Sequence, residues 1–264
     1  MKITLQVAAA LSLLAVVAPL RAQAPAARVD ASAPVVKAGP DGQPNAAFIK
    51  MHESFLARGK AGPIGVLFLG DSITAGWTPA NGSRAHIWDT YFGKMQPANF
   101  GIGGDQTQHV IWRIANGELD GISPKVVVLM LGTNNTGPAP GGHTAAEIAA
   151  ADKKIVQLIR EKTGAKVLLL AVFPRGARKD QQGVIQDSAI TDAARRTEII
   201  NAVNRELAKL DDGKNVRYLD INHVFLGQDG KIPFSIMPDQ LHPNTAGYQL
   251  WADAMKPLLT EMMK

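Results

Sequence analysis

Apolar residues in this chain fall into short continuous runs that alternate with stretches of helical spacing. Five runs have the length and composition of β-strands: 65–69, 97–100, 125–131, 166–172 and 216–219. Two of these runs are apolar at every position over 126–131 and 167–172, which is typical of parallel strands covered on both faces.

The stretches between these runs have apolar residues at helical spacing. They predict a short helix from Ala46 and longer helices at about 106–116, 144–162, 190–210 and 245–262. Strands that alternate with helices indicate βαβ units with right-handed crossovers and an open parallel sheet of five strands, an α/β fold. Such sheets bind ligands at the carboxyl ends of their strands.

The amino-terminal residues have a pattern of their own. Lys2 precedes an apolar stretch over 3–20, and Ala22-Gln23-Ala24 has the small-x-small pattern of a cleavage site. We expect residues 1–24 to be a secretory signal peptide, with cleavage after Ala24 or Ala26, and the protein to be periplasmic or secreted. An uncleaved membrane anchor is the alternative, since the run is just long enough to span a bilayer.

Residues 25–45 are rich in Ala, Pro and Gly, and we expect them to form a flexible linker. The domain itself then covers 46–264, with no internal repeat. Lys2 and Arg21 account for two of the five net positive charges, so removal of 1–24 leaves +3. This small excess, with no long basic run, predicts no nucleic-acid partner.

Composition excludes several other functions. The chain has no cysteine, so it forms neither disulfides nor cysteine-ligated metal sites, and no HExxH-like spacing is present. We therefore expect no cofactor and no metal. The length of 264 residues, 46% of them hydrophobic, allows a core that is stable without such supports.

Polar residues and glycines follow the first three predicted strands, at Gly70-Asp71-Ser72, 99–105 and Gly132-Thr133-Asn134-Asn135. A fourth polar segment, 238–243, precedes the last predicted helix. In an open parallel sheet all four would converge on one edge. Each alone is most often an ordinary turn or cap, and it is their joint occurrence that predicts a site.

Together these segments contain the parts of a hydrolytic serine site. A serine hydroxyl needs a base to take its proton, and His242 can be that base for Ser72. Asp239, three residues earlier, can hold the imidazole and stabilise the imidazolium. The backbone N–H groups of Ser72 and Gly104 and the side-chain amide of Asn134 can donate to the oxyanion.

Two competing motifs fail on inspection. Residues 70–74 are not G-x-S-x-G, because Thr74 stands at the last glycine position, so the α/β-hydrolase nucleophile elbow is absent. Residues 101–106 begin like a dinucleotide-binding loop, but Gln106 replaces its third glycine. The long connection over 174–189 carries Arg175, Arg178 and Lys179. We expect these side chains to be solvated, and a position at the border of the cleft is the alternative.

These motifs resemble the four blocks of the SGNH (GDSL) hydrolase superfamily. The matching residues are Gly70-Asp71-Ser72, Asn99-x-Gly101 with Gly104, Gly132-Thr133-Asn134, and Asp239-x-x-His242. Within this superfamily, the chain most resembles the catalytic subunits of platelet-activating factor acetylhydrolase IB and their exported bacterial relatives. The segments that carry this resemblance are 99–119, 124–135, 173–176 and 241–248. The resemblance covers about 64–262.

The resemblance implies a flavodoxin-like three-layer α/β/α sandwich and a metal-independent esterase for short acyl groups. It assigns Ser72, Asp239 and His242 to a catalytic triad and Ser72, Gly104 and Asn134 to an oxyanion hole. Three flanking residues are our hypothesis for a small acyl pocket: Ile73, Thr133 and Leu241. The chain departs from those subunits in its export signal and in 74–77 after the nucleophile, and both departures disfavour a phospholipid substrate.

We therefore expect an exported esterase that removes acetyl groups from a small-molecule or glycan ester, with O-acetylated carbohydrate as the favoured substrate. A lysophospholipase-like or thioesterase-like lipid acyl hydrolase is an alternative, as is an acetyltransferase with the same triad. A non-catalytic glycan-binding module on this fold is the alternative from another class. The sequence does not predict an oligomeric state, and it predicts no membrane insertion after signal cleavage.

Overall fold

The computed structural model describes residues 29–77, 83–137 and 142–264. The expected signal peptide lies outside the described residues. Five parallel strands form one sheet in the order β2-β1-β3-β4-β5. The strands are β1 (Val66–Gly70), β2 (Pro97–Gly101), β3 (Val126–Met130), β4 (Lys166–Leu170) and β5 (Val216–Leu219). All five predicted strands are therefore present, as is the predicted α/β class.

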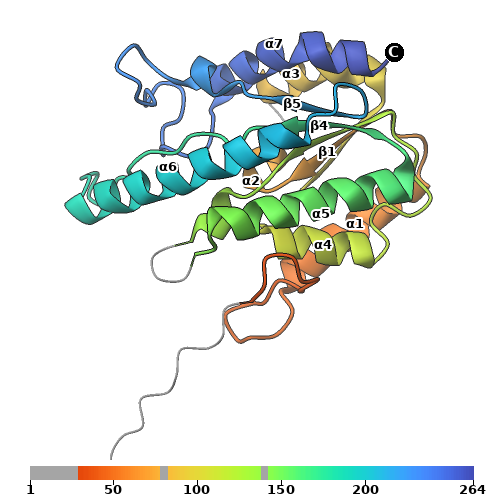
Figure 1. Cartoon of the computed structure of the whole chain (residues 1–264), viewed down its shortest axis with the longest axis horizontal. Helices are drawn as coiled ribbons and strands as arrows, with labels where there is room; N and C mark the ends of the chain where they lie inside the picture. Colours follow the sequence, from red (N-terminus) through yellow and green to blue (C-terminus); the bar gives the residue numbers. More distant parts are fainter. Residues whose placement is uncertain (1–28, 78–82, 138–141) are drawn as a thin grey trace, which may run out of the picture.

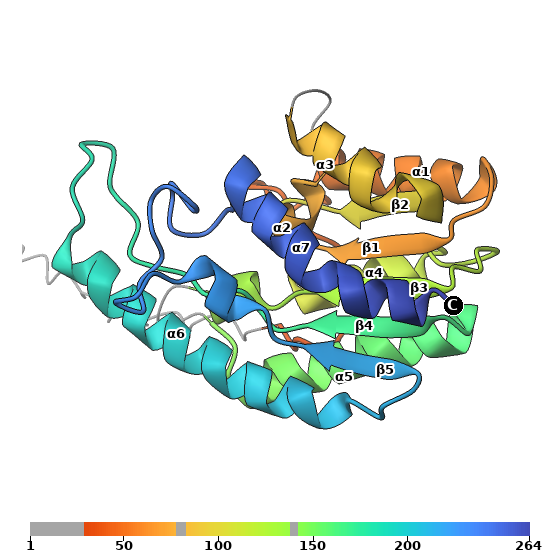
Figure 2. The ribbon, with the colours of Figure 1, turned by 90° about the horizontal axis from the view of Figure 1, so that it is seen from above.

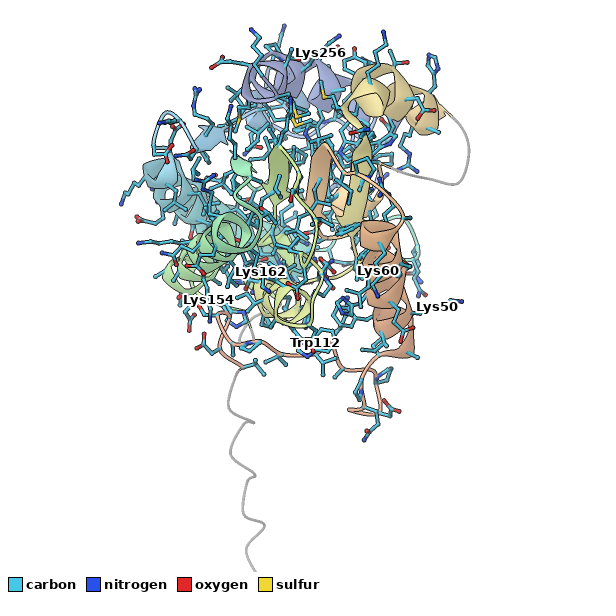
Figure 3. All side chains as sticks on the ribbon, turned by 90° about the vertical axis from the view of Figure 1, so that its right-hand side faces the viewer. Lys50, Lys60, Trp112, Lys154, Lys162 and Lys256 are labelled. Atoms are coloured by element: carbon cyan, nitrogen blue, oxygen red, sulfur yellow. The ribbon has the colours of Figure 1, made fainter. Side chains whose placement is uncertain are left out.

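Helices cover both faces of this sheet (Figure 1). They are α1 (Ala46–Lys60), α2 (Ser72–Ala75), α3 (Ser83–Phe92), α4 (Thr107–Ala115), α5 (Ala145–Thr163), α6 (Asp187–Leu207) and α7 (Thr245–Met262). Figure 3 shows the sheet between two layers, with Lys256 of α7 on one outer surface and Lys50 of α1 and Lys162 of α5 on the other side. Helix α3 was not predicted from the sequence.

Alternate strand residues supply the two cores. Leu67 and Leu69 face the layer that contains α1, α4, α5 and α6, whereas Val66 and Phe68 face α3 and α7. On the second face Phe68 packs within an aromatic cluster with Trp77, Trp88 and Phe92. This cluster fixes the segment after the first strand against the sheet and so bears directly on the predicted nucleophile.

Residues 29–45 differ from the expected flexible linker. Ala31 is fully buried in the core, and its carbonyl accepts a hydrogen bond from Thr107 Oγ1 (2.8 Å). Lys154 Nζ donates to the Ser32 carbonyl (2.9 Å), and the Val35 N–H donates to Gln108 (3.2 Å). These contacts tie the segment to α4 and α5, because it covers apolar surface that these helices would otherwise expose.

Among the described residues, no helix combines the length and the apolar character needed to cross a bilayer.

An unusual carboxyl group lies beneath the carboxyl edge of the sheet. Asp152 of α5 is 1% exposed, and neither of its side-chain oxygens has a hydrogen-bond partner among the described residues. A Cβ atom placed on Gly132 would lie 3.6 Å from Asp152 Oδ2, so the carboxyl group is directly behind the turn after β3. Burial, and secondarily the charge of Asp71, raises the pKa of Asp152 well above its usual value.

This raised pKa predicts how stability depends on pH. Since the folded-state pKa exceeds the unfolded value, the folded chain retains a proton that the unfolded chain has lost, and stability falls as pH rises above about 4. Asp152→Asn removes this titration. We expect it to raise the free energy of unfolding by about 1–3 kcal/mol at pH 8, with the gain shrinking towards pH 4. Urea titrations at several pH values measure this.

The matched control is Asp89→Asn, which changes an exposed carboxylate on α3. We expect it to change the unfolding free energy by less than about 0.5 kcal/mol at either pH. A loss of stability in Asp152→Asn at pH 8 would contradict the burial argument.

Candidate active site

Ser72 lies where the first strand turns sharply into α2. A Cβ atom at Gly70 would lie 2.5 Å from the Met130 carbonyl oxygen of the neighbouring strand, so only glycine fits there. Asp71 then caps α2 by accepting a hydrogen bond from the Ile73 N–H (2.9 Å). Ser72 is the first residue of α2, and its backbone N–H is therefore one of the groups without a partner inside the helix.

The end of β2 supports this short helix. Asn99 Nδ2 donates to the Thr74 carbonyl (2.9 Å), while its Oδ1 accepts from the Gly101 N–H (2.9 Å). A side chain at Gly101 would overlap the backbone nitrogen of Ala75. The Asn99-x-Gly101 pattern thus exists to let α2 pack closely against β2.

The structure brings the three predicted triad residues together. Ser72 Oγ lies 2.9 Å from His242 Nε2, and His242 Nδ1 lies 2.7 Å from Asp239 Oδ2. The other oxygen of Asp239 accepts the backbone N–H groups of His242 (2.7 Å) and Leu241 (3.1 Å). Asp239 therefore orients both the imidazole and the loop that carries it. In this arrangement Nδ1–H donates to the carboxylate and Nε2 is available as a base.

Competing effects act on the Asp239 carboxyl group. Burial works to raise its pKa, but the His242 backbone N–H, the His242 imidazole and the Leu241 N–H together hold the pKa below its usual value. The group is therefore ionised throughout the neutral range, as a carboxylate that stabilises an imidazolium must be.

The loop that carries Asp239 and His242 is held by contacts on both sides. Gln240 has a φ of +61°, a left-handed conformation that is unfavourable for a residue other than glycine. Its carbonyl accepts the Gly176 N–H (2.8 Å), and its side-chain amide donates to Ile232 (3.1 Å). Just beyond, Tyr248 Oη of α7 donates to the Ile73 carbonyl (2.6 Å), which ties this loop region to α2.

Asn134 lies beside the nucleophile turn. It belongs to the 3₁₀ turn Thr133–Thr136 that follows β3, and its carbonyl accepts from Gln106 Nε2 (3.0 Å). Its side-chain amide donates to the Asp105 carbonyl (2.9 Å) and, at 3.4 Å, to Asp71 Oδ2. Both amide hydrogens therefore have partners, and the one directed at Asp71 is held by the weaker contact.

Gly104, the other predicted donor, has a φ of +72° and sits in the turn after β2. A Cβ atom on its neighbour Gly103 would lie 4.0 Å from Ser72 Cβ, which places this turn next to the nucleophile. Lys37 Nζ donates to the Gly103 carbonyl and pairs with Asp105 (3.3 Å). Sequence reasoning missed Lys37, since it stands in a segment rich in Ala, Pro and Gly that shows no catalytic pattern.

A buried ion network lies beneath this turn. Arg113 Nε is 3.1 Å from Asp105 Oδ2, and Arg113 Nη1 is 2.7 Å from Glu118. Burial raises the pKa of Asp105 to about 6, against the lowering effect of Arg113 and Lys37. Removing one member would leave a buried charge without a partner, which lowers the stability of the folded protein. These residues therefore hold the turn in place.

A cavity of about 350 Å³ opens beside Asp239 and His242. Its walls include Arg84, Pro238, Asp239, His242 and Pro243, of which Arg84 was not predicted. The three residues of the hypothetical acyl pocket do not line this cavity. They are buried instead, with Ile73 and Thr133 1% exposed and Leu241 7% exposed.

Arg178 and Lys179 in the connection over 174–189 are exposed, as expected, whereas Arg175 is not. Arg175 is partly buried, and its Nη1 donates to Thr133 Oγ1 (3.2 Å). Arg178 Nη2 lies 3.0 Å from Asp239 Oδ2, the same oxygen that faces the imidazole. A basic residue in a loop gives no sequence signal for such a contact, because tertiary packing alone decides which carboxylate it meets.

Within residues 29–77, 83–137 and 142–264, no group of three His, Cys, Asp or Glu side chains is placed to hold a metal ion.

The chain is similar in sequence to known proteins. Residues 68–250 match the model of the GDSL-like Lipase/Acylhydrolase family. The chain is 34% identical over 224 residues to platelet-activating factor acetylhydrolase IB subunit alpha1 of Bos taurus, covering 84% of this chain and 87% of that protein. It is 32% identical over 233 residues to the alpha2 subunit of Rattus norvegicus, covering 88% and 92%.

Solved structures share the fold. A putative platelet activating factor from Streptococcus pneumonia has a TM-score of 0.62 at 21% identity, covering 80% of this chain and 92% of that one. An acetyl xylan esterase, AlAXEase, has a TM-score of 0.50 at 21% identity, covering 74% and 98%. This chain therefore belongs to the GDSL-like lipase/acylhydrolase family and is a carboxylic ester hydrolase.

Proposed function

We propose that this chain is an exported serine esterase that removes acetyl groups from O-acetylated carbohydrate. The observation that carries the proposal is the hydrogen-bonded series Ser72 Oγ–His242 Nε2 (2.9 Å) and His242 Nδ1–Asp239 Oδ2 (2.7 Å). Likeness in fold to an acetyl xylan esterase supports the carbohydrate substrate, and the apolar stretch after Lys2 supports export.

Mass spectrometry of the mature chain tests export: the chain should begin at residue 25 or 27 rather than at Met1.

The reaction follows the two-step course of acyl transfer to serine. Ser72 Oγ attacks the ester carbonyl carbon while His242 Nε2 takes the hydroxyl proton, and Asp239 stabilises the imidazolium. The negative charge that develops on the carbonyl oxygen is met by the N–H groups of Ser72 and Gly104 and by the Asn134 amide. Collapse of this intermediate breaks the C–O bond, and His242 returns the proton to the departing alcohol.

The acetyl group then remains on Ser72. His242 takes a proton from water, the hydroxide oxygen attacks the acetyl carbon, and the second tetrahedral intermediate collapses to acetate. The proton on His242 passes back to Ser72 Oγ as the C–O bond breaks. No step requires a group beyond the protein and water.

Ser72→Ala is the direct test of the nucleophile. With the hydroxyl removed, we expect kcat for release of acetate from acetylated xylan to fall by a factor of about 10³ or more. The measurement is enzymatic assay of acetate released by purified mature protein, with Ser54→Ala, an exposed serine on α1, as the matched control. Equal rates for wild type and Ser72→Ala would contradict the assignment, and no acetate release by wild type would contradict the carbohydrate substrate.

Acyl-chain length tests the small acyl pocket formed by Ile73, Thr133 and Leu241. Because all three side chains are already buried against neighbouring residues, they leave little room for a longer chain. We expect kcat/KM for 4-nitrophenyl acetate to exceed that for 4-nitrophenyl octanoate by about ten-fold or more. Faster hydrolysis of the octanoate would overturn the acetyl preference.

One observation favours a second candidate, a lipid acyl hydrolase. A cavity of about 680 Å³ lies between α6 and the loop that precedes Asp239, and its walls include the exposed apolar residues Ile190, Leu226 and Phe234. Alkyl chains fit such surfaces. A higher kcat/KM for a 1-alkyl-2-acetylglycerophospholipid than for acetylated xylan would favour this candidate over the first.

A further inference from the structure

Four arginines gather where α6 meets the loop after β4. They are Arg175, Arg178, Arg195 and Arg196. Three of them, Arg175, Arg178 and Arg196, line a cavity of about 200 Å³ together with Asp192, and we call this cavity the arginine pocket. The part of α6 that forms it projects beyond the carboxyl ends of the strands (Figure 2), at the edge where the triad lies.

The carboxylates around the arginine pocket do not balance its positive charge. Asp192 pairs with both Arg195 (2.8 Å) and Arg196 (2.5 Å), and the other nearby carboxylate, Asp239, pairs with Arg178 (3.0 Å) and belongs to the triad. Among the described residues, the ion pairs of these four guanidinium groups thus involve two carboxylates. Such an excess of like charge is unfavourable unless an anion joins it.

Arg175 carries most of this imbalance. Among the described residues no carboxylate lies within ion-pair distance of it, and its buried Nε–H has no hydrogen-bond partner. Its Nη1 donates only to neutral oxygens of Thr133, at 3.2 and 3.5 Å. Burial first, and then the charge of Arg196, lowers the pKa of Arg175 to about 10. A partly buried cation without a counter-ion is typical of a binding site for an anion.

The arginine pocket also adjoins the catalytic residues. Arg175 contacts Thr133, which directly precedes the oxyanion residue Asn134, and Arg178 contacts Asp239. A substrate with its ester at Ser72 therefore has the arginine pocket within reach of its alcohol part.

We propose that the arginine pocket is a subsite for an anionic group on the alcohol part of the ester. The proposal rests on the esterase function above and narrows its substrates to acidic ones. A guanidinium fork binds a carboxylate or a phosphate through two parallel hydrogen bonds, and 200 Å³ admits such a group with the carbon that bears it. The anion has two possible sources, the carboxylate of an acidic sugar and the phosphate of a glycerophospholipid.

Two pairs of substrates, which differ within each pair only in the anion, test the proposal. The sugar pair is an O-acetylated methyl galacturonoside with a free carboxylate and its methyl ester. The lipid pair is 1-alkyl-2-acetylglycerol 3-phosphate and 1-alkyl-2-acetylglycerol. The measured quantity is the ratio of kcat/KM within each pair, which cancels any effect of a substitution on the acetyl-transfer chemistry that both members share.

Arg178→Gln and Arg196→Gln are the variants, because each removes one charge from the arginine pocket. The matched control is Lys179→Gln, which removes a neighbouring charge whose ammonium lies over the Phe234 ring (4.5 Å) and outside the pocket. Arg178 is 52% exposed, so its replacement leaves the core intact even if Arg196→Gln were to fold poorly.

We expect wild type to prefer the anionic member of one pair by about ten-fold or more, as befits one charge-assisted hydrogen bond. The pair that shows the preference identifies the source of the anion. Arg178→Gln and Arg196→Gln should bring that ratio close to one, and Lys179→Gln should preserve it. If the ratio fell to about one in all three variants, the long-range electrostatic field of the surface would explain the preference. That result would overturn the subsite.

Ratios near one in both pairs for wild type would likewise overturn the proposal. Hydrolysis of 4-nitrophenyl acetate, which has no such anion, separates this outcome from failure of the esterase function. If wild type hydrolyses that ester and still shows no preference, the subsite is wrong and the esterase stands. If it hydrolyses none of these esters, the esterase function itself fails.

Discussion

The hydrogen bond between Ser72 and His242 joins two segments that lie 170 residues apart in the chain, and the rest of the structure serves to keep it at 2.9 Å. One partner follows the first strand of the sheet, and the other precedes the last helix. The parallel sheet makes the meeting possible, since its strands all end at one edge. Contacts such as Tyr248 with the Ile73 carbonyl then fix the distance locally.

Charged groups around this bond are buried to an unusual degree. Burial raises the pKa of Asp71 to about 7 and that of Asp105 to about 6, whereas the hydrogen bonds of Asp239 lower its pKa in spite of burial. The carboxylate that faces the imidazole therefore stays ionised in the neutral range, while those behind it take up protons more readily. Asp239 and His242 themselves are partly exposed, so the buried carboxylates lie behind the site rather than in it.

Much of the fold could be predicted from the chain because its signals are local. A run that is apolar at every position, such as 126–131, has few structures open to it other than a covered strand. Helix α3 escaped prediction because only Ile87, Trp88 and Phe92 form its buried face. The packing of residues 29–45 on the domain could not be predicted, because it consists of the burial of Ala31 and a few hydrogen bonds to the backbone, which leave no signal in composition.

The residues of the candidate site also divide into those that the sequence could predict and those that it could not. Ser72 and the Asp239-x-x-His242 pair could be predicted as neighbours because the proposed chemistry requires these residue types, and the first strand and the last helix place them at one edge of the sheet. Lys37 and Arg178 could not be found, since their contacts with Asp105 and Asp239 depend on how loops fold over the edge of the sheet. From sequence alone, arginines in a polar loop are expected to be solvated, because their tertiary contacts are not encoded locally.

Covalent labelling tests most directly whether His242 activates the Ser72 hydroxyl. A fluorophosphonate reacts with a serine whose hydroxyl is activated by an adjacent base, and mass spectrometry of the digested protein locates the adduct. We expect a single adduct, on the peptide that contains Ser72, and its loss in His242→Ala while the protein stays folded. An adduct on another serine, or equal labelling of Ser72 without His242, would contradict it.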